Sequence, residues 1–408
     1  MKITILTQYF PPEVGAPQNR LSELAVRFKK KGADISVITA IPNYPQMEIH
    51  KGYKGKFYFF EIINDIPVHR CWIFVSKSKS ITKRLLNYFS FVFTSLIIGL
   101  FKIKKSDVLF VESPPLFLGI SAYLLSRLKG AKLIFNVSDL WPESAEKLGL
   151  VRNRFLIKLS KHLEEFCYKK ASLITGQTQG ICENIRKRFP DKDIYWLKNG
   201  VDINYYNVKK QLDSNWRNDN GFLPDDIILI YAGILGYAQG LEIIIKTAKK
   251  LVENKKIKFV FLGSGPEKSK LINLKLENNL ENVYFFEAVP KQKMLEILSS
   301  INGSIIPLKK LELFKGAIPS KIFENLALKK PIILGVDGEA KDLFINKGKC
   351  GLFFEPENVD DLVKQINYFV KNPGLLQKFG ENGFEYVSKE FNRDIIANEF
   401  WQKINTIL

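Results

Sequence analysis

The feature that most constrains the fold of this chain is a regular alternation of short β-branched runs with helical stretches, repeated in both halves of the sequence. Parallel strands need a crossover connection, usually a helix, so this alternation predicts parallel sheets covered by helices. The expected strands are Ile3–Thr7, Ile35–Thr39, Val108–Glu112, Lys132–Val137, Leu173–Gly176, Tyr195–Lys198, Ile227–Ala232, Lys258–Leu262, Val283–Phe286, Ser304–Pro307, Pro331–Leu334 and Gly351–Phe354.

A chain of 408 residues is too long for one ordinary core and suits two doubly wound α/β domains. Turn chemistry at residues 199–202 and a polar stretch at 209–220 place the boundary near residue 205, which gives domains 1–205 and 206–408. After Pro373 two helices are expected, at 375–387 and 392–407, with no strand left for them to cross to. The last helix is a candidate to pack back on the first domain.

Charge is distributed unevenly between the halves. The formal net charge is +19, and residues 1–205 hold 32 Lys and Arg against 17 Asp and Glu. A one-sided basic lobe favours an anionic partner, either nucleic acid or phospholipid head groups. The four scattered cysteines form neither a disulfide framework nor a zinc motif, and the N-terminus lacks the apolar region of a signal peptide. The expected location is therefore the cytoplasm.

One apolar segment interrupts the α/β pattern within residues 81–105. Residues 85–101 contain no charge and twelve large apolar side chains, while residues 77–105 contain seven positive and no negative charges. A membrane span needs about 20 residues, and basic residues at both ends give no inside/outside bias. Aromatic residues with basic flanks favour a helix lying in an anionic lipid interface. A buried core helix and a true span remain the alternatives.

Glycine-bearing turns follow two successive strands of the second half. Such glycines leave backbone N–H groups free to approach an anion, and the carboxyl ends of parallel strands lie at one edge of a sheet. The two turns together predict a nucleotide site, although each alone is consistent with an ordinary tight turn. Their glycines are Gly233, Gly236 and Gly240 in the first turn, and Gly263 and Gly265 in the second.

The turn after the first strand, residues 10–17, contains only one glycine, Gly15. It lacks GxGxxG, which argues against a dinucleotide-dependent dehydrogenase. A small residue at a strand-to-helix turn still permits a phosphate to approach the helix N-terminus. Gly15 is therefore a candidate contact for the phosphate of a nucleotide ligand. The alternative is a tight turn without a ligand.

A third element of the second half places a lysine at a helix start. Pro319 and Ser320 begin the helix, Lys321 lies in its first turn, and Glu324 follows one turn later. A lysine in this position is unfavourable without a counter-anion, which a diphosphate supplies, and Glu324 is suited to accept hydrogen bonds from ribose hydroxyls. The alternative is an ordinary surface Lys–Glu pair.

The ordered set of the 233–240 turn, Gly-Ser-Gly-Pro-Glu at 263–267 and the helix with Glu324 resembles the C-terminal domain of retaining GT-B glycosyltransferases of family 4. Residues 10–17, 139–143, 199–202 and 238–242 also fit, so the resemblance covers nearly the whole chain. The stretches DLWPE, AQGLE and PSKIFE resemble the bacterial subgroup that adds N-acetyl-L-fucosamine or a related aminosugar in O-antigen or capsule assembly. The implied fold is GT-B, with two Rossmann-like domains facing across a cleft.

Two departures from the family pattern concern the donor contacts. Many members carry two glutamates eight positions apart; Glu324 matches the second, whereas Gly316 stands at the first. Tyr237 and Gln239 stand where Arg or Lys is common in the family. Contacts to the diphosphate are then expected from Lys321, from main-chain N–H groups, or from Lys309, Lys310 and Lys315.

Asp139 follows an expected strand of the first half, and the resemblance implies that this neighbourhood lies close to the transferring sugar. We expect Asp139 to accept a hydrogen bond from a sugar or acceptor hydroxyl; the alternative is an N-cap on the helix after Pro142. None of the three histidines lies in a motif, and the one D-x-D, at 191–193, reads as a polar loop. No metal or other cofactor is expected.

The sequence thus predicts an enzyme on the inner face of the cell membrane that moves an aminosugar from a UDP-sugar to a polyprenyl-diphosphate-linked saccharide with retention of configuration. Asp139 and Lys321 are the expected catalytic residues. A UDP-sugar epimerase of the same architecture is one alternative, but it does not need the apolar 85–101 segment. A nucleic-acid-binding protein accounts for the charge, yet no RNA-binding or helix-turn-helix pattern is present, so no nucleic-acid partner is expected.

Overall fold

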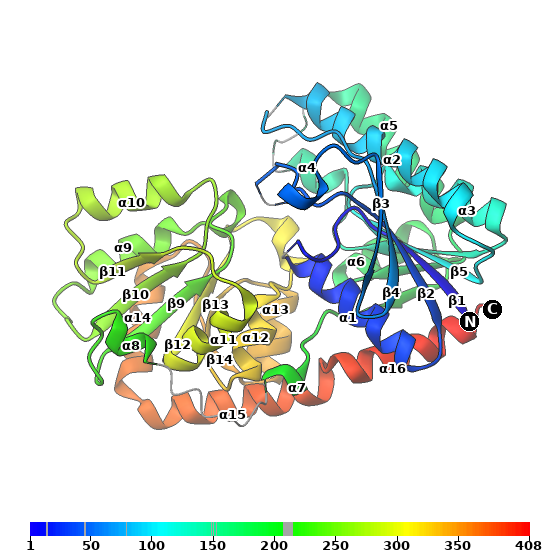
Figure 1. The fold of residues 1–408 in the computed structure, drawn as a ribbon. Helices are drawn as coiled ribbons and strands as arrows, with labels where there is room; N and C mark the ends of the chain where they lie inside the picture. The colour runs from blue at the N-terminus through cyan, green and yellow to red at the C-terminus, as the bar shows by residue number, and fades with distance from the viewer. Residues whose placement is uncertain are drawn as a thin grey trace. The chain divides into compact units, whose positions relative to one another are not determined.

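The computed structural model describes residues 1–13, 15–44, 46–78, 80–147, 149, 151, 153–206 and 215–408. The chain forms two compact units (Figure 1), one of residues 1–199 with 393–408 and one of residues 200–392. Residues 200–205 thus belong to the second unit, because Val201 bridges to Asn392 and its N–H donates to the carbonyl of Phe391 at 2.9 Å. Part of the stretch at 209–220 and Lys79, a basic flank of the apolar segment, lie outside the described residues.

The first unit is built on an eight-stranded sheet in the order β3-β4-β2-β1-β5-β6-β7-β8. Its neighbouring strands pair in parallel, except for the antiparallel edge strand β3. The strands are β1 (Lys2–Leu6), β2 (Asp34–Ala40), β3 (Tyr58–Ile63), β4 (Ile66–Cys71), β5 (Val108–Ser113), β6 (Lys132–Val137), β7 (Leu173–Gly176) and β8 (Ile194–Trp196).

The hairpin β3–β4 is absent from the expected strands. Its turn residues Asn64 and Asp65 both have positive φ, 50° and 59°. Two such residues are typical of the tight turns that join antiparallel strands, and an Asn-Asp pair between two apolar runs was the local signal for it. Pro67 and the polar pair His69–Arg70 obscure the apolar character of β4.

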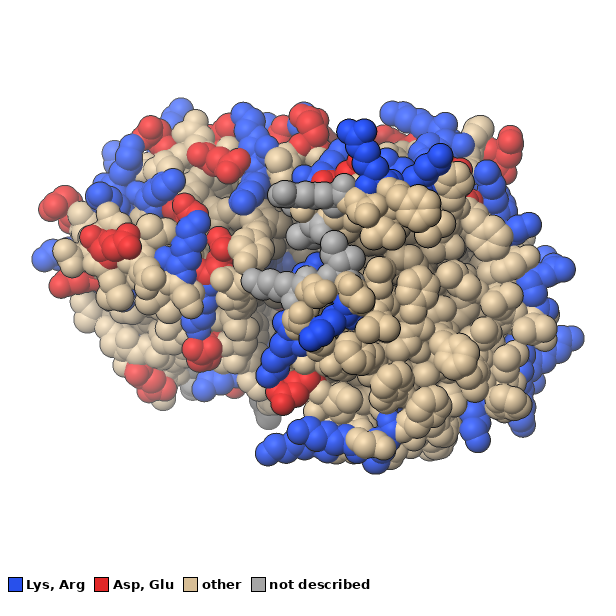
Figure 2. Space-filling view, turned by 90° about the horizontal axis from the view of Figure 1, so that it is seen from above, with Lys and Arg blue, Asp and Glu red and all other residues tan. Residues whose placement is uncertain are grey.

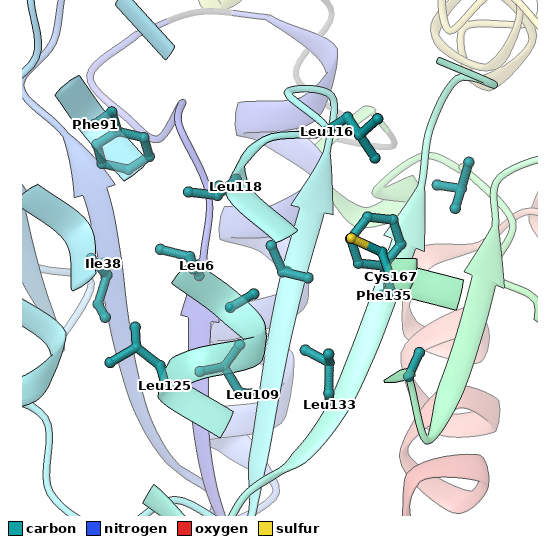
Figure 3. Close-up of a cluster of buried hydrophobic side chains, with 14 of the residues drawn as sticks. Leu6, Ile38, Phe91, Leu109, Leu116, Leu118, Leu125, Leu133, Phe135 and Cys167 are labelled. Atoms are coloured by element: carbon teal, nitrogen blue, oxygen red, sulfur yellow. The ribbon is translucent and has the colours of Figure 1, made fainter. Parts of the chain in front are cut away.

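Helices cover both faces of this sheet. One face carries the cluster in Figure 3, where side chains of the strands meet those of α2, α3 and α5, including Phe91, Leu125 and Cys167. The other face packs against α1 and the C-terminal helix α16. The helices are α1 (Ala16–Lys30), η1 (Lys51–Tyr53), α2 (Ile81–Lys102), α3 (Leu118–Lys129), α4 (Glu143–Lys147), α5 (Arg154–Lys170), α6 (Gln179–Arg188) and α16 (Arg393–Asn405).

The C-terminal helix α16 belongs to the first unit. Ile396, Ala397, Phe400 and Ile404 are buried in the same cluster as Phe28 and Phe110. Arg27 of α1 pairs with Asp394 at 2.7 Å. The chain therefore returns to the domain in which it began.

The second unit has a six-stranded, all-parallel sheet in the order β11-β10-β9-β12-β13-β14. The strands are β9 (Ile227–Ala232), β10 (Ile257–Leu262), β11 (Val283–Phe286), β12 (Gly303–Pro307), β13 (Ile332–Gly335) and β14 (Gly351–Phe353). With two Rossmann-like α/β units built on parallel sheets, the predicted fold class is confirmed.

Helices and short turns connect these strands. They are α7 (Ile203–Tyr206), α8 (Trp216–Asp219), η2 (Tyr237–Gln239), α9 (Glu242–Lys250), α10 (Lys268–Glu277), α11 (Lys291–Ser300), η3 (Glu312–Gly316), α12 (Lys321–Ala327), α13 (Glu339–Lys341), the π-helical turn η4 (Asp342–Lys347), α14 (Val359–Lys371) and α15 (Pro373–Glu390).

Helix α2 contains the apolar segment. It is the one helix among the described residues that is long and apolar enough to cross a membrane. One side of it is nevertheless buried in the first unit, including Phe91, Ser95 and Ile98, while Phe89 and Phe93 on the opposite side are exposed. The segment is therefore neither fully buried nor free of the domain.

Charge differs visibly between the two units. On the face shown in Figure 2, Asp and Glu are interspersed with Lys and Arg over the second unit. The visible face of the first unit carries mostly Lys and Arg around uncharged side chains. The excess of basic residues in the first half of the sequence is thus visible on the surface of the first unit.

Candidate functional site

The two glycine turns of the second unit pack directly against each other at the carboxyl ends of β9 and β10. Gly233 and Gly263 have φ of +132° and +147°. A Cβ on Gly263 would lie 2.0 Å from the carbonyl oxygen of Gly233, and one on Gly265 would lie 2.4 Å from that of Leu235. The N–H of Leu235 also donates to the carbonyl of Ser264 at 2.9 Å. Both the backbone conformation and the close approach require glycine here.

The available N–H groups are not those of the glycines that begin the turns. The N–H of Gly233 donates to Leu262 and that of Gly263 to Phe286, so both continue the hydrogen bonding of the sheet. The free N–H groups that the sequence predicted for these turns belong to other residues. In the described part of the chain, the N–H groups of Ile234, Ser264 and Gly265 have no acceptor.

Lys321 lies beside the first of these turns. It begins α12, and its Nζ donates to the hydroxyl of Tyr231 at 2.7 Å and lies 3.9 Å from the centre of that ring. The Tyr231 hydroxyl in turn donates to the carbonyl of Ile234 at 2.7 Å. A Cβ on Gly233 would be 3.4 Å from Nζ. The turn, the aromatic ring and the amine therefore form one constellation.

Burial controls the charge of this amine. It lowers the pKa of Lys321 to about 7, and the carboxylate of Glu324 acts in the opposite direction. The direct partner of the amine, a tyrosine hydroxyl, is neutral. An anion brought to this place therefore supplies the charge that the buried ammonium needs.

The other candidate residues of the second unit lie around this constellation. Gly240 has a φ of +60°, and a Cβ there would be 3.2 Å from Cγ of Lys309. A Cβ on Gly236 would meet the Gln239 side chain. Ser320 precedes α12 with helical backbone angles and makes no side-chain cap.

The three lysines considered as further donor contacts have different surroundings. The N–H of Lys309 donates to Ala238 in the first glycine turn at 3.0 Å. Lys310 pairs with Glu355 at 2.7 Å, and Lys315 pairs with Glu312 at 2.8 Å. Lys309 is thus the one of these three that lies against the glycine turn.

Gly15 and Asp139 belong to the first unit. Gly15 precedes α1 in extended backbone, and a Cβ there would be 2.4 Å from Oε1 of the Gln18 side chain. Asp139 follows β6, and its Oδ2 accepts from the Ser144 hydroxyl at 2.8 Å. Burial raises the pKa of Asp139, while hydrogen bonds from Ser144 and the Leu140 N–H lower it. Among the described contacts, this carboxylate accepts no backbone N–H of the helix after Pro142, so they do not support the alternative that Asp139 is an N-cap.

A polar network next to Asp139 was missed by the sequence reasoning. The buried carboxylate of Glu112 accepts from Arg20 and from Nδ2 of Asn136, both at 2.7 Å. Ser138 donates to the same carboxylate and accepts from Gln177 at 2.7 Å. Glu112 lies near the end of β5, and Ser138 directly follows β6. Polar residues at strand ends were the sequence signal that could have revealed this network. The network holds the start of the loop that carries Asp139.

Glu13 is a second buried acid that the sequence reasoning missed. Its Oε1 accepts the N–H groups of Asn43 and Tyr44 at 2.8 and 2.9 Å. Burial raises the pKa of Glu13 to about 7, against the lowering by these hydrogen bonds and by Arg70. The side chain thereby joins the loops that follow β1 and β2.

The described residues contain no group of three or more His, Cys, Asp or Glu side chains arranged to hold a metal ion. In the D-x-D turn, Asp193 pairs with Lys403 of α16 at 2.7 Å.

Family models match both units of the chain. The glycosyl transferase 4-like domain matches residues 15–197, and the glycosyl transferases group 1 model matches residues 213–386. The chain is a glycosyltransferase. The epimerase and nucleic-acid-binding alternatives are therefore not favoured.

Known proteins resemble this glycosyltransferase over its full length. WcaI of Escherichia coli, a glycosyl transferase assigned to colanic acid biosynthesis, is 24% identical over 411 residues, which cover 98% of each chain. Sucrose-phosphate synthase of Thermosynechococcus elongatus has a TM-score of 0.78 at 15% identity, covering 100% of this chain and 98% of that one. Anabaena HepE, solved with UDP and glucose, has a TM-score of 0.74 at 15% identity and covers 100% of both chains. These structures confirm the GT-B type of fold.

Proposed function

We propose that this glycosyltransferase moves an aminosugar, N-acetyl-L-fucosamine or a related deoxy-aminosugar, from a UDP-sugar to a polyprenyl-diphosphate-linked saccharide. The reaction proceeds with retention of configuration and without a metal ion. It belongs to the assembly of an O-antigen, a capsule or a similar polysaccharide, and it takes place at the inner face of the cell membrane.

The observation that carries the donor part of this proposal is the Lys321 constellation. A buried amine with a neutral partner lies against the first of two packed glycine turns, in which three N–H groups have no acceptor among the described residues. A diphosphate satisfies all of these groups. Once protonated, Lys321 stabilises the negative charge that develops on the leaving UDP, which is the type of preorganised electrostatic effect that often dominates catalysis.

The proposed sugar and acceptor are based on resemblance to other glycosyltransferases. The DLWPE, AQGLE and PSKIFE stretches resemble aminosugar transferases, and WcaI, similar over its full length, is assigned to colanic acid biosynthesis. Asp139 is the proposed contact of a sugar or acceptor hydroxyl. The departing phosphate oxygen takes the acceptor's proton, which is consistent with retention without a protein nucleophile.

The test is a donor and acceptor screen read by mass spectrometry. Purified full-length protein is incubated with a panel of nucleoside-diphosphate sugars and synthetic polyprenyl-diphosphate saccharides, with and without EDTA. We expect a product heavier by one aminosugar residue, formed from a UDP-aminosugar in both conditions, and NMR showing the donor's anomeric configuration. Transfer of a neutral hexose alone would refute the donor, and loss of product with EDTA would refute metal independence.

A further inference from the structure

Between Leu86 and Phe101 the exposed side chains of α2 are all large and apolar. Leu86, Phe89, Phe93 and Phe101 are between 44% and 81% exposed. On the opposite side, polar groups fasten the helix to its own domain: Nδ2 of Asn87 donates to the Phe74 carbonyl at 2.6 Å, and the Thr94 hydroxyl donates to the Trp72 carbonyl at 2.7 Å. The helix is therefore held in the domain while it presents large apolar side chains outward.

Two further helices extend this surface: α3 lies beside α2, and α5 lies beside α3. The hydroxyl of Ser95 in α2 donates to that of Ser121 in α3 at 3.3 Å, and the rings of Tyr123 in α3 and Phe166 in α5 are 5.0 Å apart. Leu124 and Leu128 of α3 and Phe155 and Leu159 of α5 are also exposed. These four side chains and the four of α2 form what we call the apolar face, which lies in the right-hand part of Figure 2.

The charges on these three helices have nearly one sign. The helices contain ten Lys and Arg but only two acidic residues, Glu164 and Glu165. Glu164 is buried and pairs with Arg188 at 2.7 Å. Among the described residues, Lys83, Arg84, Arg154 and Lys158 have no carboxylate within ion-pair distance. Figure 2 shows Lys and Arg at the margins of the apolar face.

We propose that the apolar face formed by α2, α3 and α5 docks flat on an anionic lipid bilayer. The large side chains enter the interface, and the surrounding basic side chains contact lipid phosphates. This inference deepens the proposed membrane location and rests on it: the binding unit is a surface assembled from three separate sequence segments, and α2 stays packed in its domain without spanning the bilayer.

The basic residues around the apolar face indicate which partner it binds. A second copy of this chain would bring like charges together at the margins, because the same basic rim would face itself. An anionic bilayer combines an apolar layer with a negatively charged surface, which matches both parts of the face. A planar surface also contacts three parallel helices at once.

The experiment measures binding of the full chain to vesicles of phosphatidylglycerol and phosphatidylcholine. The deciding variant is Phe155→Ser with Leu159→Ser, which changes only α5. The matched control is Leu223→Ser with Leu276→Ser, two equally exposed residues of the second unit. We expect the α5 variant to bind about 10-fold or more weakly, because two large apolar side chains no longer enter the interface, and the control to bind like wild type.

A second measurement reports the orientation directly. All four native cysteines are buried, so a single exposed cysteine is labelled selectively. An environment-sensitive dye is attached at Leu159→Cys or, as control, at Leu276→Cys. We expect vesicles to shift the emission of the first dye to the blue and to leave the second unchanged.

Several outcomes would overturn the proposal. Wild-type binding by the α5 variant would restrict the interface to α2, and resistance to alkaline carbonate would indicate a span. Lack of vesicle binding, or concentration-dependent dimers in which the α5 dye is shielded, would assign the face to another role. Sugar transfer to a detergent-solubilised acceptor separates the two proposals, because the α5 variant should retain it even if docking fails.

Discussion

At the scale of single residues, Lys321 is both the donor contact that the sequence predicts and the central side chain of the proposed site. Its amine lies against Tyr231 and Gly233, on neighbouring elements of the second unit. Glu324, one turn further along α12, is the nearest charge that acts on its pKa. If the donor binds here as proposed, its binding should be sensitive to both side chains.

Lys321→Ala and Glu324→Ala are each expected to lower kcat/KM for the donor by about 10²-fold or more, which corresponds to the loss of about 3 kcal/mol of charge-assisted contact. Steady-state kinetics with the donor identified by the screen provide the measurement. Lys310→Ala is the matched control, since Lys310 is exposed and paired with Glu355. Normal kinetics in both folded variants would place the donor elsewhere.

The charge of Lys321 also predicts a dependence of stability on pH. In the unfolded chain its pKa returns to its ordinary value near 10.5, whereas in the folded protein it is about 7. Between these values the unfolded state binds more protons, so the stability contribution of this group rises as the pH increases from 7 toward 10. Relative to Lys321→Met, wild type should gain about 2 kcal/mol between pH 7 and 9. Denaturant unfolding of both proteins measures this, and parallel pH profiles would contradict it.

Asp139→Asn is expected to reduce kcat by about 10-fold or more with little change in donor KM, because the amide preserves shape but removes the charge that the transition state uses. Asn can still accept from Ser144, so the local fold should persist. Ser144→Ala separates the roles, because it removes the hydrogen bond but keeps the carboxylate. An unchanged kcat in Asp139→Asn would mean that the carboxylate only orders its loop.

At the scale of elements, α2 shows how one apolar run serves two environments. Successive residues of a helix point about 100° apart, so residues two positions apart lie on roughly opposite sides of it. Phe91 is consequently buried whereas Phe93, two residues later, is mostly exposed. Because the segment is apolar throughout, its sequence alone does not show which residues are buried and which are exposed.

Substitutions on the two sides of α2 should therefore have different consequences. Phe91→Ala is expected to lower the free energy of unfolding by about 3–5 kcal/mol, because it opens a cavity in the core. Phe93→Ser should change it by less than about 0.5 kcal/mol and weaken vesicle binding instead. Thermal unfolding in the absence of lipid distinguishes them, and equal destabilisation would show that Phe93 is also a packing residue.

At the scale of the whole molecule, the chain passes from the first unit to the second near residue 199 and returns near residue 393. The return delivers α16 to the sheet on which the chain began, where Phe400 contacts Phe28, Phe110 and Tyr195. The first unit is thus completed only by the last residues of the chain.

Phe400→Ala is expected to destabilise the first unit by about 3–5 kcal/mol, because its ring is fully buried among three aromatic neighbours. Limited proteolysis should then cut within residues 1–199 before it cuts the second unit. Leu408→Ala, at an exposed terminal residue, is the control and should behave like wild type. Preferential cutting of the second unit in Phe400→Ala would contradict this assignment.

The local sequence determined most of the strands, the two-domain fold and the residue types of the proposed donor site. β-branched runs and glycine turns express preferences within a few residues, so β9 and Gly233 could be located without knowledge of their partners. The hairpin β3–β4 was missed although its signal was local, because polar residues break its pattern.

Only the tertiary structure decided which of these pieces meet. The contact of Lys321 with Tyr231, the packing of Gly263 on Gly233 and the burial of Phe400 join residues distant in sequence, and local preference carries no information about such pairs. The apolar face is the clearest case. Phe155 and Leu159 share a layer with α2 only because a parallel sheet aligns its crossover helices on one face.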